Sequence, residues 1–100
     1  MVEVDLVSDE KRLHNVFAIR EQVFVQEQGV DPSVERDEVD KNGLHFLATW
    51  QGVPVGAGRL VVCGDRGKIG RLCVLREYRG QGIGQALMQA IERNARKLGL

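Results

Sequence analysis

The stretch Arg71–Gly84, RLCVLREYRGQGIG, decides the fold, because an apolar run passes through a short polar link into three closely spaced glycines. Gly80, Gly82 and Gly84 alternate at the start of a helical pattern. Glycine in regular structure costs roughly 0.5–1 kcal/mol relative to alanine, so this spacing indicates a turn, a nearby ligand, or both. The stretch therefore predicts a strand, a tight connection and a helix.

Composition and charge describe one small globular domain. Hydrophobic residues make up 43% and charged residues 28% of the 100 residues, which argues against disorder. The 14 Lys and Arg balance the 14 Asp and Glu, so nothing attracts the whole chain to nucleic acid or to an anionic membrane. No apolar run approaches the ~20 residues that span a bilayer, and the acidic N-terminus is unlike a signal peptide. We therefore expect a cytoplasmic protein.

Hydrophobic periodicity predicts the first half of the chain. Residues 2–6 alternate apolar and acidic side chains, which is typical of a strand with one buried face. Ser8 or Asp9 is placed to cap a helix. The apolar stripe of that helix consists of Leu13, Val16, Phe17, Val23 and Phe24. Residues 26–42 are polar and acidic, and they indicate a long loop with one short helical turn.

Three β-rich runs and a helix fill the second half. Runs 45–50 and 53–62 are joined by Gln51-Gly52, a two-residue hairpin connection, and a turn at 64–67 leads to a third run at 68–75. Gly56 and Gly58 in the second run indicate a bulge or a close backbone approach. The predicted order is strand, helix, loop, three strands and helix. This is an α/β or α+β domain, with a mostly antiparallel sheet flanked by helices.

The two cysteines predict neither a metal site nor a disulfide. They have no CxxC spacing and no nearby histidine cluster. Read about the turn at 64–67, Cys63 lies opposite Lys68 and Cys73 lies opposite Gly58, so the two thiols cannot meet.

The glycines predict an anion site at the N-terminus of the last helix, where unpaired N–H groups carry a partial positive charge. Arg76 and Arg79 add positive charge beside it. A P-loop is excluded because the chain holds no Lys-Ser or Lys-Thr pair. A dinucleotide-binding fingerprint is disfavoured, because the spacing here is G-x-G-x-G after an antiparallel meander.

The pattern [RQ]-x-x-G-x-[GA], satisfied by Arg79, Gly82 and Gly84, resembles motif A of the GNAT superfamily of acyl-CoA-dependent N-acyltransferases. Residues 20–28 are similar to the segment that opens a branch of small bacterial GNAT proteins. The resemblance implies that residues 1–100 form the N-terminal part of a GNAT domain, up to the motif A helix. It implies acetyl-CoA as co-substrate, no metal, and a small-molecule or peptide amine as acceptor.

The resemblance also assigns the binding residues. It places the CoA pyrophosphate on the N–H groups of Arg79, Gly80, Gln81, Gly82, Ile83 and Gly84, and the pantetheine arm along Leu72, Cys73 and Val74. The backbone N–H of Val74 would polarise the thioester carbonyl. The implied reaction is direct attack of the amine in a ternary complex. The alternative is a CoA-binding or dimerisation fragment of a GNAT domain without turnover.

The acidic loop and the start of the next strand offer five candidates for a general base, namely Glu27, Glu35, Asp37, Asp40 and His45. Of these we take Glu35, Asp37 and His45 as the catalytic candidates. Taken singly, each acid fits a solvated loop face better than catalysis. As a cluster with Asp40, the acids are a candidate site for a cationic amine. A lone histidine such as His45 is more often structural.

Three further expectations follow. Arg20 is expected at the surface, solvated or in a salt bridge. Cys73 is expected to be a small apolar strand residue rather than an acyl carrier. In a GNAT domain ending after the motif A helix, strand 68–75 would present an open edge. We therefore expect either a homodimer or another assembly that covers this edge, or a longer protein of which residues 1–100 are a part.

Overall fold

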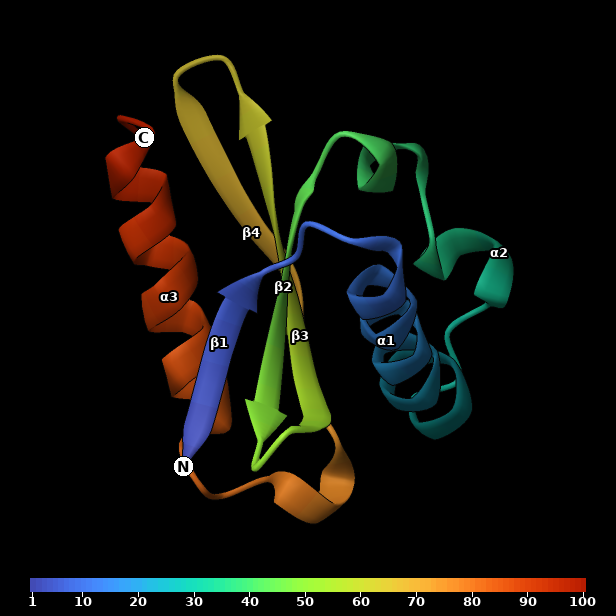
Figure 1. Ribbon diagram of the computed structural model, residues 1–100. Coiled ribbons are helices and arrows are strands. Elements are labelled where there is room, and N and C mark those ends of the chain that lie inside the picture. Colours follow the sequence, from blue (N-terminus) through green and yellow to red (C-terminus); the bar gives the residue numbers. More distant parts are fainter.

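A four-stranded antiparallel sheet in the order β1-β2-β3-β4 forms the centre of the computed structural model, which describes residues 1–100 (Figure 1). The strands are β1 (Val2–Leu6), β2 (Leu44–Trp50), β3 (Val53–Cys63) and β4 (Arg66–Val74). The longer helices are α1 (Glu10–Arg20), which continues as the π-helix η1 (Glu21–Glu27), and α3 (Ile83–Lys97). Short helices are α2 (Pro32–Glu35), η2 (Glu38–Lys41) and η3 (Arg76–Tyr78). The predicted fold class and element order are confirmed.

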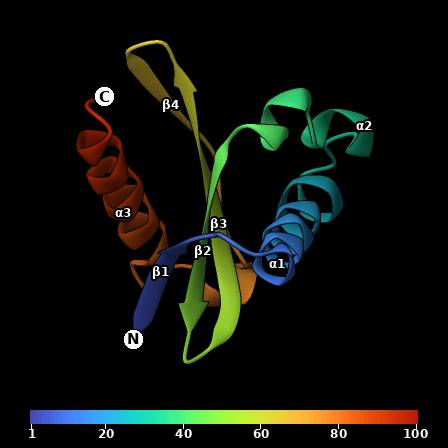
Figure 2. The same ribbon diagram turned by 45° about the horizontal axis from the view of Figure 1, so that its top comes forward.

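The two long helices cover opposite faces of the sheet, with α3 on one side and α1 on the other (Figures 1 and 2). Each helix presents its apolar stripe to the strands, which gives two core clusters. The α3 cluster contains Phe46, Ala48, Val55, Leu60, Ile83, Leu87 and Ile91. The α1 cluster contains Val16, Ile19, Val23, Leu47, Ala57 and Cys73.

Two glycines let α3 pack directly on β3. A Cβ atom on Gly58 would lie 2.7 Å from Cδ1 of Ile91, and one on Gly56 would lie 3.0 Å from Cδ1 of Leu87. Both distances are shorter than an ordinary van der Waals contact, so a side chain at either position would require its neighbours to shift. The predicted close approach at Gly56 and Gly58 is confirmed.

A β-bulge interrupts β4 beside Gly58. Ala57 pairs with Cys73 but Arg59 pairs with Gly70, so two residues of β4 lie opposite one residue of β3. Arg71, at the bulge, has a φ of 51°, which is rare outside glycine.

The expected register of the last hairpin was wrong. Cys63 pairs with Arg66 across a two-residue turn, and β4 begins two residues before the predicted Lys68 and ends at Val74 rather than Leu75. Cys73 lies opposite Ala57, because the bulge shifts the pairing by one residue. Cys63 is exposed and Cys73 is buried, and both are free thiols.

The N-terminal predictions need one extension. Asp9 caps α1 by accepting a 2.7 Å hydrogen bond from the N–H of Arg12, as predicted, and the helical course continues through η1. The predicted loop contains two short helices, α2 and η2, rather than one turn. No helix is both long and apolar enough to cross a membrane.

Candidate active site

The outer edge of β4 has no neighbouring strand, and Val74 turns its backbone toward that edge. The N–H of Leu75 donates to the carbonyl of Val55 at 2.8 Å. Because antiparallel pairs alternate, the neighbouring pair Gly56 and Val74 is a non-hydrogen-bonded one. The N–H and C=O of Val74 therefore face away from β3. The carbonyl accepts a 2.9 Å hydrogen bond from Nε of Arg79, and the N–H is left for a ligand.

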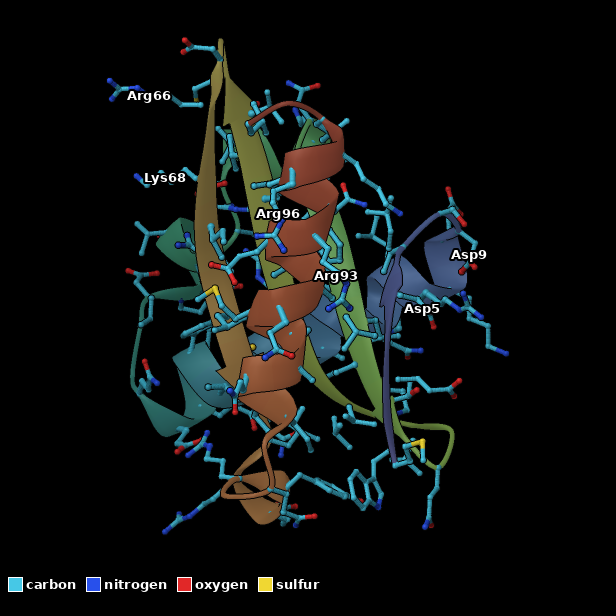
Figure 3. All side chains as sticks on the ribbon, turned by 90° about the vertical axis from the view of Figure 1, so that its left-hand side faces the viewer. Asp5, Asp9, Arg66, Lys68, Arg93 and Arg96 are labelled. Atoms are coloured by element: carbon cyan, nitrogen blue, oxygen red, sulfur yellow. The ribbon has the colours of Figure 1, made fainter.

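Figure 3 shows Arg66 and Lys68 on the first half of β4. Both are exposed charged residues, which discourage pairing with another strand on that half of the edge. The apolar half at Leu72–Val74 lies farther along the strand, toward the glycine loop. The two halves of this edge therefore differ in chemistry.

The loop between η3 and α3 exposes a helix N-terminus. Gly80 and Gly82 have φ values of 81° and 83°, a left-handed conformation that glycine adopts without strain. The first backbone hydrogen bond of α3 runs from Ala86 to Gly82 at 3.0 Å. The N–H groups of residues 83–85 thus have no intrahelical acceptor, and they carry the positive end of the helix dipole. This geometry suits an anionic group such as a phosphate.

A cavity of about 260 Å³ lies between this loop and the open edge of β4, and its lining combines predicted and unpredicted residues. The predicted ones are Leu72, Cys73, Val74, Arg79 and Gly84. Val23 and Gln28, from the η1 side, complete the lining and were missed from the sequence. Both lie within residues 20–28, whose similarity to a segment of small bacterial GNAT proteins was the signal that could have found them.

The remaining loop residues, Gly80, Gln81, Gly82 and Ile83, do not line this cavity. The Ile83 side chain is buried in the α3 core cluster, so only its backbone N–H is available to a ligand. Gly84 lies beside the strand, since a Cβ there would be 3.8 Å from Cγ2 of Val74.

Cys73 forms part of the cavity wall as an unreactive thiol. Burial raises the pKa of Cys73 to about 12, and a nearby backbone hydrogen bond from Ala57 only partly offsets that effect. Because the thiolate is the nucleophilic form, this cysteine is a poor acyl acceptor at neutral pH. The small apolar role predicted for it agrees with the geometry.

The acidic loop is not a solvated face, because Arg20 binds it from the core. Arg20 is 1% exposed and Glu35 is 4% exposed, which corrects the expectations for both. Nε of Arg20 donates to Oε2 of Glu35 at 2.8 Å, and Nη1 donates to Oδ1 of Asp40 at 2.8 Å. Arg20 follows Val16 by four residues, so helical spacing placed it on the apolar stripe.

Asp40 is saturated by hydrogen bonds from the protein. Its Oδ1 accepts from Arg20 and from Nη1 of Arg59, and its Oδ2 accepts from Nη2 of Arg20 and from the N–H of Asp37. Burial opposes ionisation, but these hydrogen bonds outweigh it and hold the pKa of Asp40 below its ordinary value. A carboxylate with all four acceptor sites occupied has none left for a substrate amine.

Two more arginines bring Asp37 into the same cluster. Nη1 of Arg59 donates to Oδ1 of Asp37 at 2.8 Å, and Nη2 of Arg71 donates to Oδ2 at 3.2 Å. Arg71 also binds the backbone carbonyl of Glu35 at 3.0 Å. Residues 35–40 are therefore fastened to α1, β3 and β4, and we call these three arginines with Glu35, Asp37 and Asp40 the arginine cluster. The acids do not form an open site for a cation.

His45 supports the same loop from β2. It is 6% exposed, its Nε2 lies 2.9 Å from the carbonyl oxygen of Asp40, and its ring meets the edge of Phe17. The carbonyl can only accept, so Nε2 is the protonated nitrogen. His45, Glu35 and Asp37 do not line the 260 Å³ cavity, and their role as general base stays a prediction.

A larger hollow of about 510 Å³ lies along α1, between residues such as Leu13 and Phe17 and the α2 residues Pro32 and Glu35. It shares no lining residue with the smaller cavity. It contains neither the open edge of β4 nor the glycine loop that opens α3. The smaller cavity is therefore the candidate active site.

No group of three or more His, Cys, Asp or Glu side chains is arranged to hold a metal ion. The candidate site instead offers backbone N–H groups and an apolar wall. These features fit the anionic and apolar parts of an acyl-CoA molecule.

Comparison with known proteins identifies relatives among the acetyltransferases. The family model described as the acetyltransferase (GNAT) family matches residues 11–100. A candidate acetyltransferase of Bacillus subtilis is 40% identical over 102 aligned residues, which cover 99% of this chain and 69% of that protein.

Two crystal structures share the fold. A candidate N-acetyltransferase from Lactobacillus plantarum has a TM-score of 0.89 at 28% identity, covering 98% of this chain and 69% of that one. An acyl-CoA N-acyltransferase from Pseudomonas aeruginosa has a TM-score of 0.85 at 27% identity, covering 98% and 73%. Together with the strand edge and the glycine loop, these matches show that the chain belongs to the GNAT family of acetyltransferases.

Proposed function

We propose that this protein transfers an acetyl group from acetyl-CoA to an amine by direct attack in a ternary complex. One observation carries the proposal: the outward N–H of Val74 and the free N-terminus of α3 border the same 260 Å³ cavity. The first suits a developing oxyanion, and the second suits a pyrophosphate.

Each part of the site has one task. When bound, acetyl-CoA supplies a thioester whose acyl group moves to the amine nitrogen, with the C–S bond breaking and CoA leaving as the thiol. The N–H of Val74 polarises the acyl carbonyl, and the loop N–H groups of residues 80–84 hold the pyrophosphate. Leu72 and Cys73 line the pantetheine path. The acceptor amine must reach this site neutral, and Glu35, Asp37 and His45 remain the proposed bases.

A charge placed on the cavity wall tests the donor site. Gly84→Glu puts a carboxylate beside the anion site, and we expect it to weaken acetyl-CoA binding by more than about tenfold in calorimetry. Gly84→Gln has the same size without the charge and should bind more tightly than Gly84→Glu. Gln89→Glu adds the same charge to the exposed surface of α3 and should bind as the unmodified protein does. Equal binding of acetyl-CoA by all three variants would contradict the assignment of the acetyl-CoA site to this loop.

A turnover assay distinguishes an acetyltransferase from a CoA-binding fragment without turnover. Release of free thiol from acetyl-CoA in the presence of a panel of small and peptide amines would support acyl transfer. Binding without thiol release by any amine would favour a CoA-binding fragment without turnover.

We also propose that a second copy of the chain covers part of the open edge of β4. β4 has one free side along its length, and an unpaired strand edge is a template for pairing with another strand. Arg66 and Lys68 discourage pairing on the first half of this edge, so the second copy would cover the apolar half at Leu72–Val74 when no CoA is bound. Sedimentation should then show a dimer, and a stable monomer at high protein concentration would contradict this assembly.

A further inference from the structure

The guanidinium of Arg79 is held on two sides. Nη1 and Nη2 donate to the two carboxylate oxygens of Glu27 at 2.6 Å and 2.7 Å, and Nε donates to the carbonyl of Val74 at 2.9 Å. A bidentate arginine–carboxylate pair fixes the plane of the guanidinium as well as its position. Glu27 thereby connects the end of η1 to the strand whose backbone faces the cavity.

We propose that Glu27 is a positioning residue for acyl transfer, which orients Arg79 so that Arg79 holds the outward-facing backbone of Val74 in place. This inference rests on the proposed function, because it gives the N–H of Val74 its task. Arg79, which lines the cavity, thereby connects Glu27 at the end of η1 with the backbone of β4.

Other roles for Glu27 fit the geometry less well. Both carboxylate oxygens bind Arg79, and the hydrogen bonds from Arg79 lower the pKa of Glu27, so it stays ionised and is a poor proton acceptor. A carboxylate also repels a polyanion such as CoA. An acid beside an anion site therefore needs a compensating task, and fixing Arg79 supplies one.

The geometry of η1 places Glu27 near two residues that line the cavity. η1 is a π-helix, in which each turn holds more residues than in an α-helix, and such segments are frequent at functional sites. Val23 and Gln28 line the cavity and Glu27 binds Arg79, so residues four and five apart face β4 from one side of η1. This matches the wide turn of a π-helix.

Kinetics of Glu27→Gln test the proposal. We expect kcat to fall about tenfold, because a misplaced oxyanion donor loses part of its transition-state effect, while KM for acetyl-CoA changes less than about threefold. Glu21→Gln, which removes an exposed carboxylate from the start of η1, should leave both constants unchanged. An unchanged kcat in Glu27→Gln would overturn the proposal. So would a lower KM with unchanged kcat, because that result would assign Glu27 to charge repulsion alone.

A double-mutant cycle shows whether Glu27 acts through Arg79. In an Arg79→Gln background, Glu27→Gln should lower kcat no further, since the connection through Arg79 is already lost. Independent, additive losses would contradict a shared path and overturn the proposal.

A spectroscopic readout without CoA separates this inference from the proposed function. The Nε–H proton of Arg79 should exchange slowly with water in the NMR spectrum of the unmodified protein and rapidly in Glu27→Gln. Equal protection in both would overturn the positioning role, whatever the enzyme does. Failure of the unmodified protein to bind or turn over acetyl-CoA would instead refute the proposed function, and the exchange result would still decide the role of Glu27.

Discussion

The arginine cluster and the glycine loop both gather strongly polar groups, but they differ in what remains unpaired. In the cluster, Asp40 accepts four hydrogen bonds from the protein itself. In the loop, the N–H groups that open α3 have no acceptor within the helix. The polar groups of the arginine cluster bind one another and hold the chain together. The N–H groups of the glycine loop remain available to a ligand. The protein therefore satisfies the Asp40 carboxylate in the arginine cluster, where Nε of Arg59 is buried without a partner, whereas the binding site keeps unpaired backbone N–H groups.

The largest effect should come from removing the centre of the cluster. Arg20→Ala leaves Glu35 and Asp40 with one cationic partner fewer in a buried setting, and breaking a buried ion pair costs about 3–5 kcal/mol of unfolding free energy. Urea denaturation followed by circular dichroism measures this loss.

Arg12→Ala is the matched control, because Arg12 pairs with Asp9 at 3.8 Å with both side chains half exposed. Its cost should stay below about 1 kcal/mol. Similar losses in the two variants would mean that burial does not distinguish the cluster from an ordinary surface pair.

A smaller effect should appear as a dependence of stability on pH. Burial opposes the ionisation of Asp40, but the hydrogen bonds from Arg20, Asp37 and Arg59 outweigh it and hold the pKa of Asp40 below its ordinary value. Between the folded and unfolded pKa values the unfolded chain binds more protons, so stability is fully present above about pH 4 to 5 and falls as the pH drops below that range. Thermal melts across pH 2 to 7 measure this slope, which Asp40→Asn should reduce.

Asp5 provides the comparison for that slope. It is exposed on β1, on the opposite edge of the sheet from β4 (Figure 3). Asp5→Asn should leave the acid slope as it is in the unmodified protein. If Asp40→Asn also leaves the slope unchanged, acid sensitivity does not arise at the arginine cluster.

The smallest effect should come from the cavity wall. Cys73→Ala should change kcat less than about threefold, because the raised pKa of Cys73 keeps its thiol protonated at pH 8. Iodoacetamide at that pH should modify the exposed Cys63 and spare Cys73. Loss of turnover in Cys73→Ala together with an acetylated Cys73 in the mass spectrum would contradict direct attack.

Much of the fold could be predicted because local patterns determined it. Alternation gave β1, the Gln51-Gly52 turn gave the β2–β3 hairpin, and the stripe from Ile83 onward gave α3. The residues that converge on the candidate site, such as Val74 and Gly84, came from a motif confined to fourteen consecutive positions. Elements formed by residues close together in sequence produce a periodic pattern of apolar residues, which can be detected from the sequence alone.

The missed features depend on distant partners. Glu27 and Arg79 are 52 positions apart, and Arg71 and Asp37 are 34 apart. A run of acids looks solvated until the arginines from α1, β3 and β4 are placed around it. Arg20 and Arg59 did carry a signal, since each occupies a position where the pattern of its helix or strand calls for a buried residue.

The bulge at Arg71 changes which residues of β4 direct their backbone N–H and C=O groups toward β3. Counting from the two-residue turn, regular alternation would direct the backbones of Arg66, Lys68, Gly70, Leu72 and Val74 toward β3. The extra residue transfers that orientation to Cys73 and Leu75, and it leaves the N–H of Val74 facing outward. Deleting one residue at this point would point the same N–H into the sheet while leaving its side chain chemistry intact. The length of β4, as much as its composition, thus determines whether the strand presents a donor to a ligand.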